Sequence, residues 1–233
     1  MAGEGSGVLV RYRERHFLVT AAHVADKVAS LWILLPHAPL DVAKAVGGHV
    51  VKTPVPASGQ REDDSLDIAV MEIQAAAVAE LTTTYQFVEE TLLGVEYPAF
   101  AEARYLLAGY PATQTKTLGT TVKSVFRAFQ ATINQEFPFA ITKFRHDHNL
   151  AVIFSGEQFP LTGGSAALAP KMPGMSGGGL WFFNNYLEEN VAAQTKLVGI
   201  IIEQYPKPPH NPEAILATKL TVVLRIIEQA FFT

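Results

Sequence analysis

Three residues whose side chains could act together on a carbonyl group follow one another along the chain: His23, Asp67 and Ser176. A serine hydroxyl is a weak nucleophile until an adjacent base takes its proton. A neutral histidine can be that base because its pKa lies near physiological pH. A carboxylate on the other ring nitrogen fixes the tautomer and stabilises the imidazolium. These residue types together indicate nucleophilic catalysis through serine.

The residues around Ser176 are suited to the same chemistry. Ser176 lies in the stretch 174–179, where four of the six residues are glycine. A tetrahedral intermediate carries an oxyanion, which needs N–H donors at a fixed position. Because glycine tolerates unusual dihedral angles and close approach, this stretch lets backbone N–H groups converge beside the hydroxyl.

Each of the three residues also has a simpler interpretation. His23 alone fits a core histidine satisfied by backbone groups, Asp67 fits a loop or cap residue, and Ser176 fits a tight turn. Three nearby acidic residues are rivals for the carboxylate role: Asp26, Asp63 and Asp64. Asp67 is preferred because it directly precedes an apolar run. The occurrence of all three residue types in this order favours the catalytic interpretation.

One other enzyme class shares the serine motif. Residues 174–178 also fit the G-x-S-x-G nucleophile elbow of α/β-hydrolases. That fold needs its acid and its histidine after the serine, and a helix directly behind it. No aspartate follows Ser176, His210 is the one later histidine, and three consecutive glycines start a helix poorly. The elbow interpretation is therefore disfavoured.

Short strand patterns dominate the chain, and they are what must position these residues. The runs that predict strands are 8–12, 16–20, 31–35, 49–52, 68–73, 105–111, 120–126, 151–154, 179–183 and 197–202. Residues 54–64 predict an exposed loop, and 74–81 are consistent with a short helix. Apolar residues at three- and four-residue spacing from Leu220 to Ala230 predict an amphipathic helix. Many short strands without long helices between them predict a sandwich or a barrel.

Composition narrows the partners and the location. The net charge is −4 and no run rich in Lys or Arg occurs, so nucleic acid is not an expected partner. The chain has no cysteine, which favours a reducing compartment. It shows no signal-peptide pattern and no apolar run of about 18 to 20 residues. We therefore expect a cytoplasmic protein with no membrane partner.

The three segments resemble the signature segments of trypsin-like (chymotrypsin-fold) serine peptidases. They read Thr20-Ala21-Ala22-His23, Asp67-Ile68-Ala69 and Gly174-Met175-Ser176-Gly177-Gly178. Their order matches the family, and so does the spacing of 44 residues between the first two. Three flanking stretches resemble family strands: 5–10, 197–200 and 217–220. The resemblance covers nearly the whole chain, with 75–165 matched by pattern alone, and it is to the bacterial type, without disulfides.

The resemblance implies an all-β fold of two packed six-stranded antiparallel β-barrels with a C-terminal helix. The first barrel, 1–98, would carry His23 and Asp67. The second, 99–233, would carry Ser176 and end in a helix at about 219–231. The active site would then lie in the cleft between the barrels.

The resemblance also implies a serine endopeptidase that acts through an acyl-enzyme. Ser176 would attack the peptide carbonyl, His23 would serve as general base and then acid, and Asp67 would orient His23. Backbone N–H groups of Gly174 and Ser176 would form the oxyanion hole. The substrate would be a protein or peptide, and no metal or organic cofactor is implied.

The sequence departs from digestive members of the family at two places. Met175 stands where those enzymes have the aspartate that receives a new N-terminus, so we expect no activation by that route. The six residues expected to contact substrate are Pro170, Lys171, Ile202, Glu203, Gln204 and Ile215. No carboxylate occurs in 170–173, and Ile215 would narrow the pocket, so a small or apolar residue is expected before the cut. Lys171 could instead receive an acidic residue, and Ile202 replaces a serine that in many members supports the catalytic aspartate.

A rival function from a different class stays open. The chain could be a regulated or non-catalytic binding or sensor module that keeps this fold and acts within a larger complex. A regulatory protein partner is consistent with either function, because a compact cytosolic peptidase must be restrained.

Overall fold

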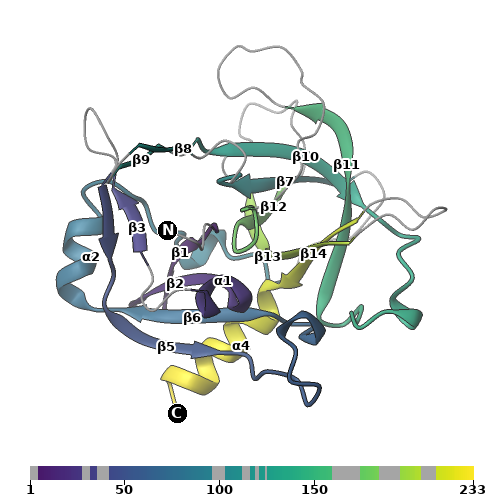
Figure 1. Cartoon of the computed structure of the whole chain (residues 1–233), viewed down its shortest axis with the longest axis horizontal. Helices are drawn as coiled ribbons and strands as arrows, with labels where there is room; N and C mark the ends of the chain where they lie inside the picture. The colour runs from purple at the N-terminus through teal and green to yellow at the C-terminus, as the bar shows by residue number, and fades with distance from the viewer. Residues whose placement is uncertain are drawn as a thin grey trace.

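The computed structural model describes residues 5–27, 32–35, 42–95, 103–111, 116–118, 121–123, 125–158, 174–183, 195–205 and 214–233 (Figure 1). Its strands form two main antiparallel units. The first third of the chain supplies a four-stranded sheet, drawn in purple and blue. The later residues supply a closed six-stranded barrel, drawn in teal, green and yellow.

The first unit has the strand order β1 (Val8–Tyr12), β2 (Arg15–Ala21), β6 (Ile68–Ile73) and β5 (Gly48–Lys52). The turn residues of the predicted β1–β2 hairpin, Arg13 and Glu14, have φ of 46° and 63°. Two positive φ values are typical of a type I′ turn, whose twist matches that of the strands. Burial alternates along β1, whereas residues 17–21 of β2 are all buried, and Val10 and Phe17 are completely buried. The hairpin thus presents one apolar face to the core.

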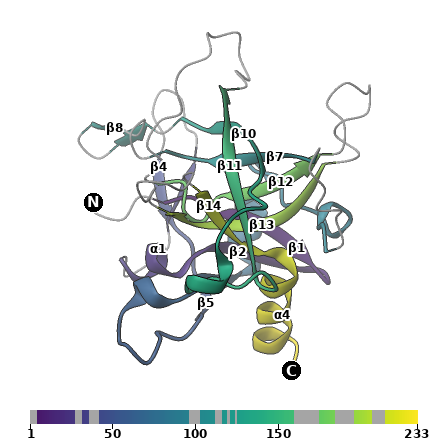
Figure 2. The ribbon, with the colours of Figure 1, turned by 90° about the vertical axis from the view of Figure 1, so that its right-hand side faces the viewer.

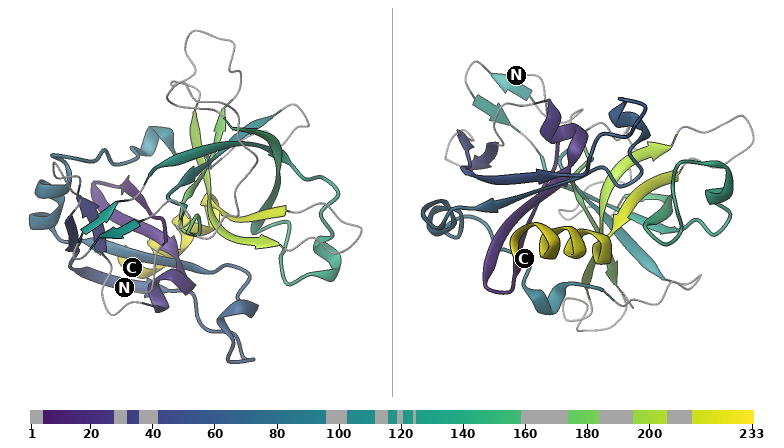
Figure 3. Two further views of the ribbon diagram at one scale, coloured as in Figure 1. Left: turned by 45° about the horizontal axis from the view of Figure 1, so that its top comes forward. Right: turned by 90° about the horizontal axis from the view of Figure 1, so that it is seen from below.

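The second unit closes on itself. Its order around the ring is β10 (Arg127–Ile133), β11 (Asn149–Gln158), β14 (Ala214–Lys219), β13 (Lys196–Tyr205), β12 (Gly179–Phe183) and β7 (Arg104–Gly109), with β7 pairing again with β10. The left panel of Figure 3 shows the strands curving around this ring. Two short hairpins lie outside the main units: β3 (Trp32–Leu35) with β4 (Val42–Ala45), and β8 (Lys116–Leu118) with β9 (Thr121–Lys123).

The C-terminal helix α4 (Leu220–Phe231) joins the two units. It packs against β13 and β14 of the barrel and against β6 of the sheet, and Figure 2 shows it at the foot of the molecule. A single apolar cluster contains Phe17 from the sheet, Ile200 from the barrel and Val223 from α4, each 0% exposed. Burial of one such side chain contributes roughly 1.5–3 kcal/mol. The units therefore share one core.

Five shorter helical segments complete the described structure. They are α1 (Ala22–Asp26), α2 (Ala75–Leu81), and the 3₁₀ turns η1 (Arg61–Asp63), η2 (Glu90–Leu92) and η4 (Phe139–Ile141). No helix of the described part is long and apolar enough to cross a membrane.

The predicted antiparallel all-β fold with a C-terminal helix is confirmed, and so is a closed six-stranded barrel in the second half. In the first half the described pairings form a four-stranded sheet and a separate hairpin rather than one six-stranded ring. The strand expected at 120–126 is wrong in part: 121–123 form β9, and the barrel strand follows at 127–133. The proposed boundary between 98 and 99 lies outside the described residues, so this division stays a prediction.

Candidate active site

The pairing of β2 with β6 brings His23 next to Asp67. These strands are antiparallel, and the last residue of β2, Ala21, lies opposite the first residue of β6, Ile68. The segment that leads into β6 therefore lies beside the segment that follows β2. The backbone N–H of Ala22 donates to the carbonyl oxygen of Asp67 at 2.9 Å. His23, in the first turn of α1, is thus fixed beside a residue 44 positions later.

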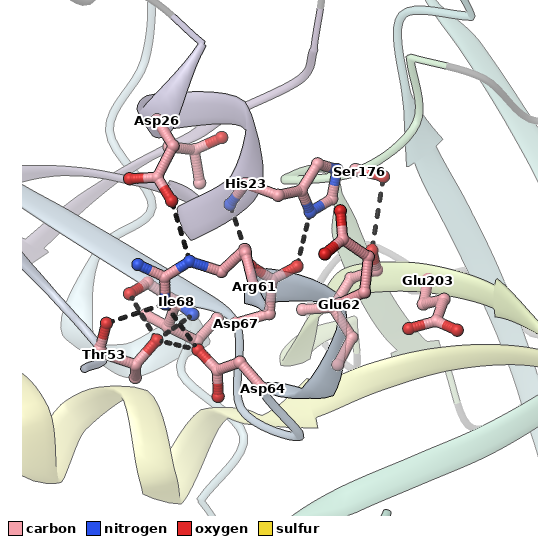
Figure 4. A network of polar contacts seen from close by, with 12 residues as sticks. His23, Asp26, Thr53, Arg61, Glu62, Asp64, Asp67, Ile68, Ser176 and Glu203 are labelled. Carbon is pink, nitrogen blue, oxygen red and sulfur yellow. Dashed lines mark hydrogen bonds and ion pairs between the residues drawn. The ribbon is translucent and has the colours of Figure 1, made fainter. Parts of the chain in front are cut away.

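Both carboxylate oxygens of Asp67 bind His23. Oδ2 lies 2.5 Å from the ring nitrogen Nδ1, and Oδ1 accepts the backbone N–H of His23 at 2.8 Å. The Asp67 residue is 6% exposed. A carboxylate at Nδ1 favours the tautomer with the proton on that nitrogen, which leaves the lone pair of Nε2 for another proton. In Figure 4 the imidazole lies between the Asp67 carboxylate and Ser176.

Asp67 holds an unusual backbone conformation. Its φ of 46° lies in the left-handed region, which costs a residue other than glycine roughly 1–3 kcal/mol. Neighbours on both sides compensate for this cost. The hydroxyl of Thr53 accepts the N–H of Ile68 at 3.1 Å, and the N–H of Thr53 donates to the carbonyl of Ile68 at 2.8 Å. Ile68, which follows Asp67, is therefore held in place by Thr53, the residue directly after β5.

The barrel supports the approach to Asp67 from the other side. Asn149 at the start of β11 donates from Nδ2 to the carbonyl of Ser65 at 2.8 Å. The hydroxyl of Thr218 in β14 donates to the carbonyl of Leu66 at 2.6 Å. Both side chains are completely buried. Neither residue was predicted from the sequence, because the partners of both are far away along the chain.

Two glycines with positive φ flank the Ser176 loop. Gly174 has a φ of 90° and Gly177 a φ of 88°. A Cβ on Gly177 would lie 2.0 Å from the carbonyl oxygen of Ser6, which is far inside van der Waals contact. The N–H of Gly177 donates to Ile201 in β13 at 2.7 Å. Glycine is thus favoured at both positions by dihedral angle, and at 177 it is also required by space.

Ser6, just before β1, holds the loop that contains Ser176. Its N–H donates to the carbonyl of Ser176 at 2.8 Å, and its hydroxyl donates to the carbonyl of Gly174 at 2.7 Å. The same hydroxyl accepts the N–H of Tyr110 at 2.8 Å, and the carbonyl of Ser6 accepts the hydroxyl of Thr20 at 2.7 Å. Ser6 is 5% exposed. A small polar residue between two glycines was the one signal in the sequence for this close approach.

The hydroxyl of Ser176 points to the backbone of β13. Oγ donates to the carbonyl oxygen of Ile202 at 3.3 Å, as Figure 4 shows with a dashed line. Ile202 itself is 1% exposed. An isoleucine side chain has no hydrogen-bond donor, and Oδ1 of Asp67 accepts the backbone N–H of His23.

The remaining predicted substrate residues fall into three groups. Glu203 forms an ion pair with Lys143, with 2.5 Å between Oε2 and Nζ, and its side chain is 35% exposed. Gln204 pairs with Ile215 across β13 and β14, and Ile215 is 2% exposed within the barrel core. Pro170 and Lys171 lie outside the described residues.

Met175 packs into the same barrel core at 1% exposure, directly before Ser176. Within the described residues, no three side chains of His, Cys, Asp or Glu gather to hold a metal ion.

Comparison with known proteins shows similarity in structure. No protein-family model matches the sequence, and no curated protein matches it. Neuropsin, a serine protease of the mouse brain, superposes with a TM-score of 0.58 and 16% identity, over 96% of this chain and 86% of neuropsin. The scabies mite inactivated protease paralogue S-I1 has a TM-score of 0.54 and 15% identity, over 99% of this chain and 96% of the paralogue.

The HtrA-type protease AlgW, solved with a decapeptide, has a TM-score of 0.50 and 15% identity, over 97% of this chain. This chain spans 50% of the AlgW chain. It has the trypsin-like fold. Identities of 15–16% show the fold alone. On a trypsin-like fold, activity depends on the site residues rather than on the architecture.

Proposed function

We propose that this chain is a serine endopeptidase. The observation that carries the proposal is the His23–Asp67 pair, in which both carboxylate oxygens are used on His23 and Nε2 is left for Ser176. In the proposed reaction His23 removes the proton of the Ser176 hydroxyl as Oγ attacks the peptide carbonyl. The imidazolium that forms is stabilised by Asp67.

The tetrahedral intermediate places negative charge on the former carbonyl oxygen. We propose that the N–H groups of Gly174 and Ser176 bind this oxyanion, with Gly174 held in its positive-φ conformation by the Ser6 hydroxyl. His23 then gives its proton to the leaving amine, which leaves an acyl group on Oγ. Water releases that acyl group in a second round of the same proton transfers.

Attack requires one rearrangement of the nucleophile. Because Oγ donates to the carbonyl of Ile202, the Ser176 side chain must turn about its Cα–Cβ bond to donate to Nε2 of His23. Hydroxyl rotamers of this kind interconvert rapidly. This rotation of the Ser176 side chain therefore precedes the attack and does not limit the rate of the reaction.

The alternative is a non-catalytic or regulated binding module. The hydrogen bond from Ser176 to Ile202 favours it, since this contact occupies the hydroxyl proton. The scabies mite paralogue, described as inactivated, also has this fold. A regulatory protein partner, a cytoplasmic location and a bacterial source remain proposals that fit either function.

Substrate preference is part of the proposal. We propose a small or apolar residue before the cleaved bond rather than Arg or Lys, and no activation by insertion of a new N-terminus. The position directly before Ser176 holds the buried Met175, and Ser6 supplies the contacts that hold this loop.

Digestion of a random peptide library, read by mass spectrometry, tests the function and the preference together. The wild-type protein is expected to cleave peptides after small or apolar residues. Ser176→Ala and His23→Ala are expected to cleave none of them above background. Cleavage that survives in Ser176→Ala would come from another nucleophile or a contaminant, and it would overturn the proposal. Absence of cleavage by the wild type would favour the binding module.

A further inference from the structure

Arg61 connects the two segments that carry His23 and Asp67. Its Nε donates to Oδ2 of Asp26 at 2.8 Å, and its Nη1 donates to Oδ2 of Asp64 at 2.9 Å. Nη1 also donates to the carbonyl oxygen of Thr53 at 2.8 Å. The side chain is 12% exposed, although it comes from the short 3₁₀ turn η1. In Figure 4 the guanidinium lies between α1 and the loop that leads to Asp67.

Each acidic partner of Arg61 lies three positions from a proposed catalytic residue. Asp26 is the last residue of α1, the single-turn helix that carries His23. Asp64 precedes Asp67, and its Oδ1 accepts the N–H of Leu66 at 2.9 Å. Oδ2 of Asp64 also accepts the hydroxyl of Thr53 at 2.5 Å. One guanidinium thereby fixes the distance between two short segments.

Neither segment is well held by its own local structure. The helix α1 has five residues, and no side chain caps its N-terminus. Helices this short are not stable without tertiary contacts. Asp67 adopts its left-handed conformation only while its neighbours hold it there. Contacts beyond the His23–Asp67 pair are therefore needed to keep the pair in register.

The charges around Arg61 are balanced locally. Burial opposes its positive charge, but hydrogen bonds and attraction from Asp26 and Asp64 outweigh burial and raise its pKa. Lys52 gives Asp26 a second partner, with 2.7 Å between Nζ and Oδ1. Lys52 reaches only the α1 side of the network in the described structure, and its side chain is 36% exposed. The bridge between α1 and the Asp64 loop is made by Arg61.

We propose that Arg61 is a positioning residue, which holds the His23 segment and the Asp67 segment at the separation that the His23–Asp67 hydrogen bonds require. Its role in catalysis rests on the proposed function above. It contacts neither of the two residues directly, so it acts through Asp26, Asp64 and Thr53. A misplacement of about 1 Å in a catalytic pair can cost about 100-fold in rate.

The test compares Arg61→Ala and Arg61→Lys with Lys52→Ala, which is the matched control. The rate constant for labelling by a fluorophosphonate is measured per reactive molecule, so that a lower folded fraction does not count as slower chemistry. Arg61→Ala is expected to react about 10- to 100-fold more slowly than wild type. Arg61→Lys should be intermediate, and Lys52→Ala should stay within about threefold because an exposed ion pair contributes little. Millimolar guanidinium chloride, but not equal sodium chloride, should partly restore Arg61→Ala.

A second readout does not depend on activity. The Nδ1 proton of His23, held by Asp67, is expected to give a low-field proton resonance in the wild-type protein. This resonance should shift or broaden in Arg61→Ala and stay unchanged in Lys52→Ala. Wild-type labelling rates together with an unchanged resonance in Arg61→Ala would overturn the positioning role.

Two other results of these experiments, a wild type that is not labelled and an Arg61→Ala variant that does not fold, also lead to a decision. If the wild type is not labelled at all, the proposed function fails, and the resonance alone decides whether Arg61 positions the pair. If Arg61→Ala does not fold, Arg61→Lys and Asp26→Asn decide in its place. Both must then show a slower rate or a shifted resonance, and wild-type behaviour of both would reject the proposal.

Discussion

The hydroxyl group of Ser6 donates a hydrogen bond of 2.7 Å to the carbonyl oxygen of Gly174, 168 positions further along the chain. Ser6 belongs to the segment that enters the N-terminal sheet, whereas Gly174 begins the loop of the proposed nucleophile. The bond therefore sets the conformation of one half of the site from the other half. Such a buried contact should be visible both in stability and in reactivity.

Replacement of Ser6 by alanine is expected to lower the free energy of unfolding by about 1–3 kcal/mol. The substitution removes the buried hydroxyl that donates to Gly174 and accepts the N–H of Tyr110. Urea denaturation followed by fluorescence measures the change. Ser58→Ala, at an exposed loop position, is the control and should stay within about 0.5 kcal/mol. An equal, small change in both variants would contradict the role given to Ser6.

Gly177→Ala should be far more damaging than Gly59→Ala. Both glycines have positive φ, 88° and 76°, so both substitutions carry the dihedral cost of roughly 1–2 kcal/mol. Only Gly177 adds a clash, because its Cβ would lie 2.0 Å from the carbonyl of Ser6, whereas no atom lies within 4 Å at Gly59. The difference between the melting temperatures of the two variants measures the cost of the clash, because the dihedral cost is common to both. Similar melting temperatures would mean that the loop around Ser176 moves away freely.

Asp67→Asn is expected to keep the fold and to lose about 10⁴-fold in labelling or hydrolysis rate. The amide would donate to Nδ1 of His23 and so favour the wrong tautomer, with the proton on Nε2. The rate constant of fluorophosphonate labelling measures this loss. Asp63→Asn, at an exposed position of the same loop, is expected to react like wild type. A small loss in Asp67→Asn, with Asp63→Asn strongly impaired, would assign the carboxylate role to the rival residue.

The Arg15–Glu72 ion pair should make stability depend on pH in the acid range. Hydrogen bonding to the Arg15 guanidinium, with two contacts of 2.5 Å, lowers the pKa of Glu72. A carboxyl group with a lowered pKa in the folded state stabilises it above the unfolded pKa of about 4.3. That contribution is lost as the pH falls below this value. Glu72→Gln should therefore destabilise the protein at pH 7 more than at pH 3.5.

Urea denaturation at the two pH values measures the difference between Glu72→Gln and wild type. Glu136→Gln, at an exposed position, is the control, and its difference from wild type should hardly change with pH. A Glu72→Gln difference that is the same at pH 7 and pH 3.5 would show that the ion pair does not stabilise the fold.

Local patterns in the sequence predicted a large part of the fold and the site. The α4 helix follows from one apolar face. The meeting of His23 with Asp67 was implied by the resemblance to trypsin-like peptidases, and in the structure the pairing of β2 with β6 brings it about. The unusual backbone dihedral angles expected of the glycine-rich stretch around Ser176 are found at Gly174 and Gly177, which have positive φ. Each of these features depends on spacing over a few residues or on one pairing of strands.

The supporting contacts could not be predicted in the same way. Ser6, Arg61 and Asn149 have no periodic pattern around them, and their roles arise where distant segments meet. Asn149, for example, reaches the carbonyl of Ser65, 84 positions earlier. Its complete burial depends on closure of the barrel, which no local pattern encodes. The strand β10 was missed for a similar reason, since its place in the barrel is set by pairing with β7 and β11.

The most direct test of the central claim is intact-mass measurement after incubation with a fluorophosphonate. One covalent adduct is expected on the wild-type protein, located by peptide mapping to Ser176. No adduct is expected on Ser176→Ala, and none within the same time on His23→Ala, because the hydroxyl then has no base. An adduct on Ser176→Ala, or a folded wild-type protein that gains no mass, would contradict the claim that Ser176 is a nucleophile activated by His23 and Asp67.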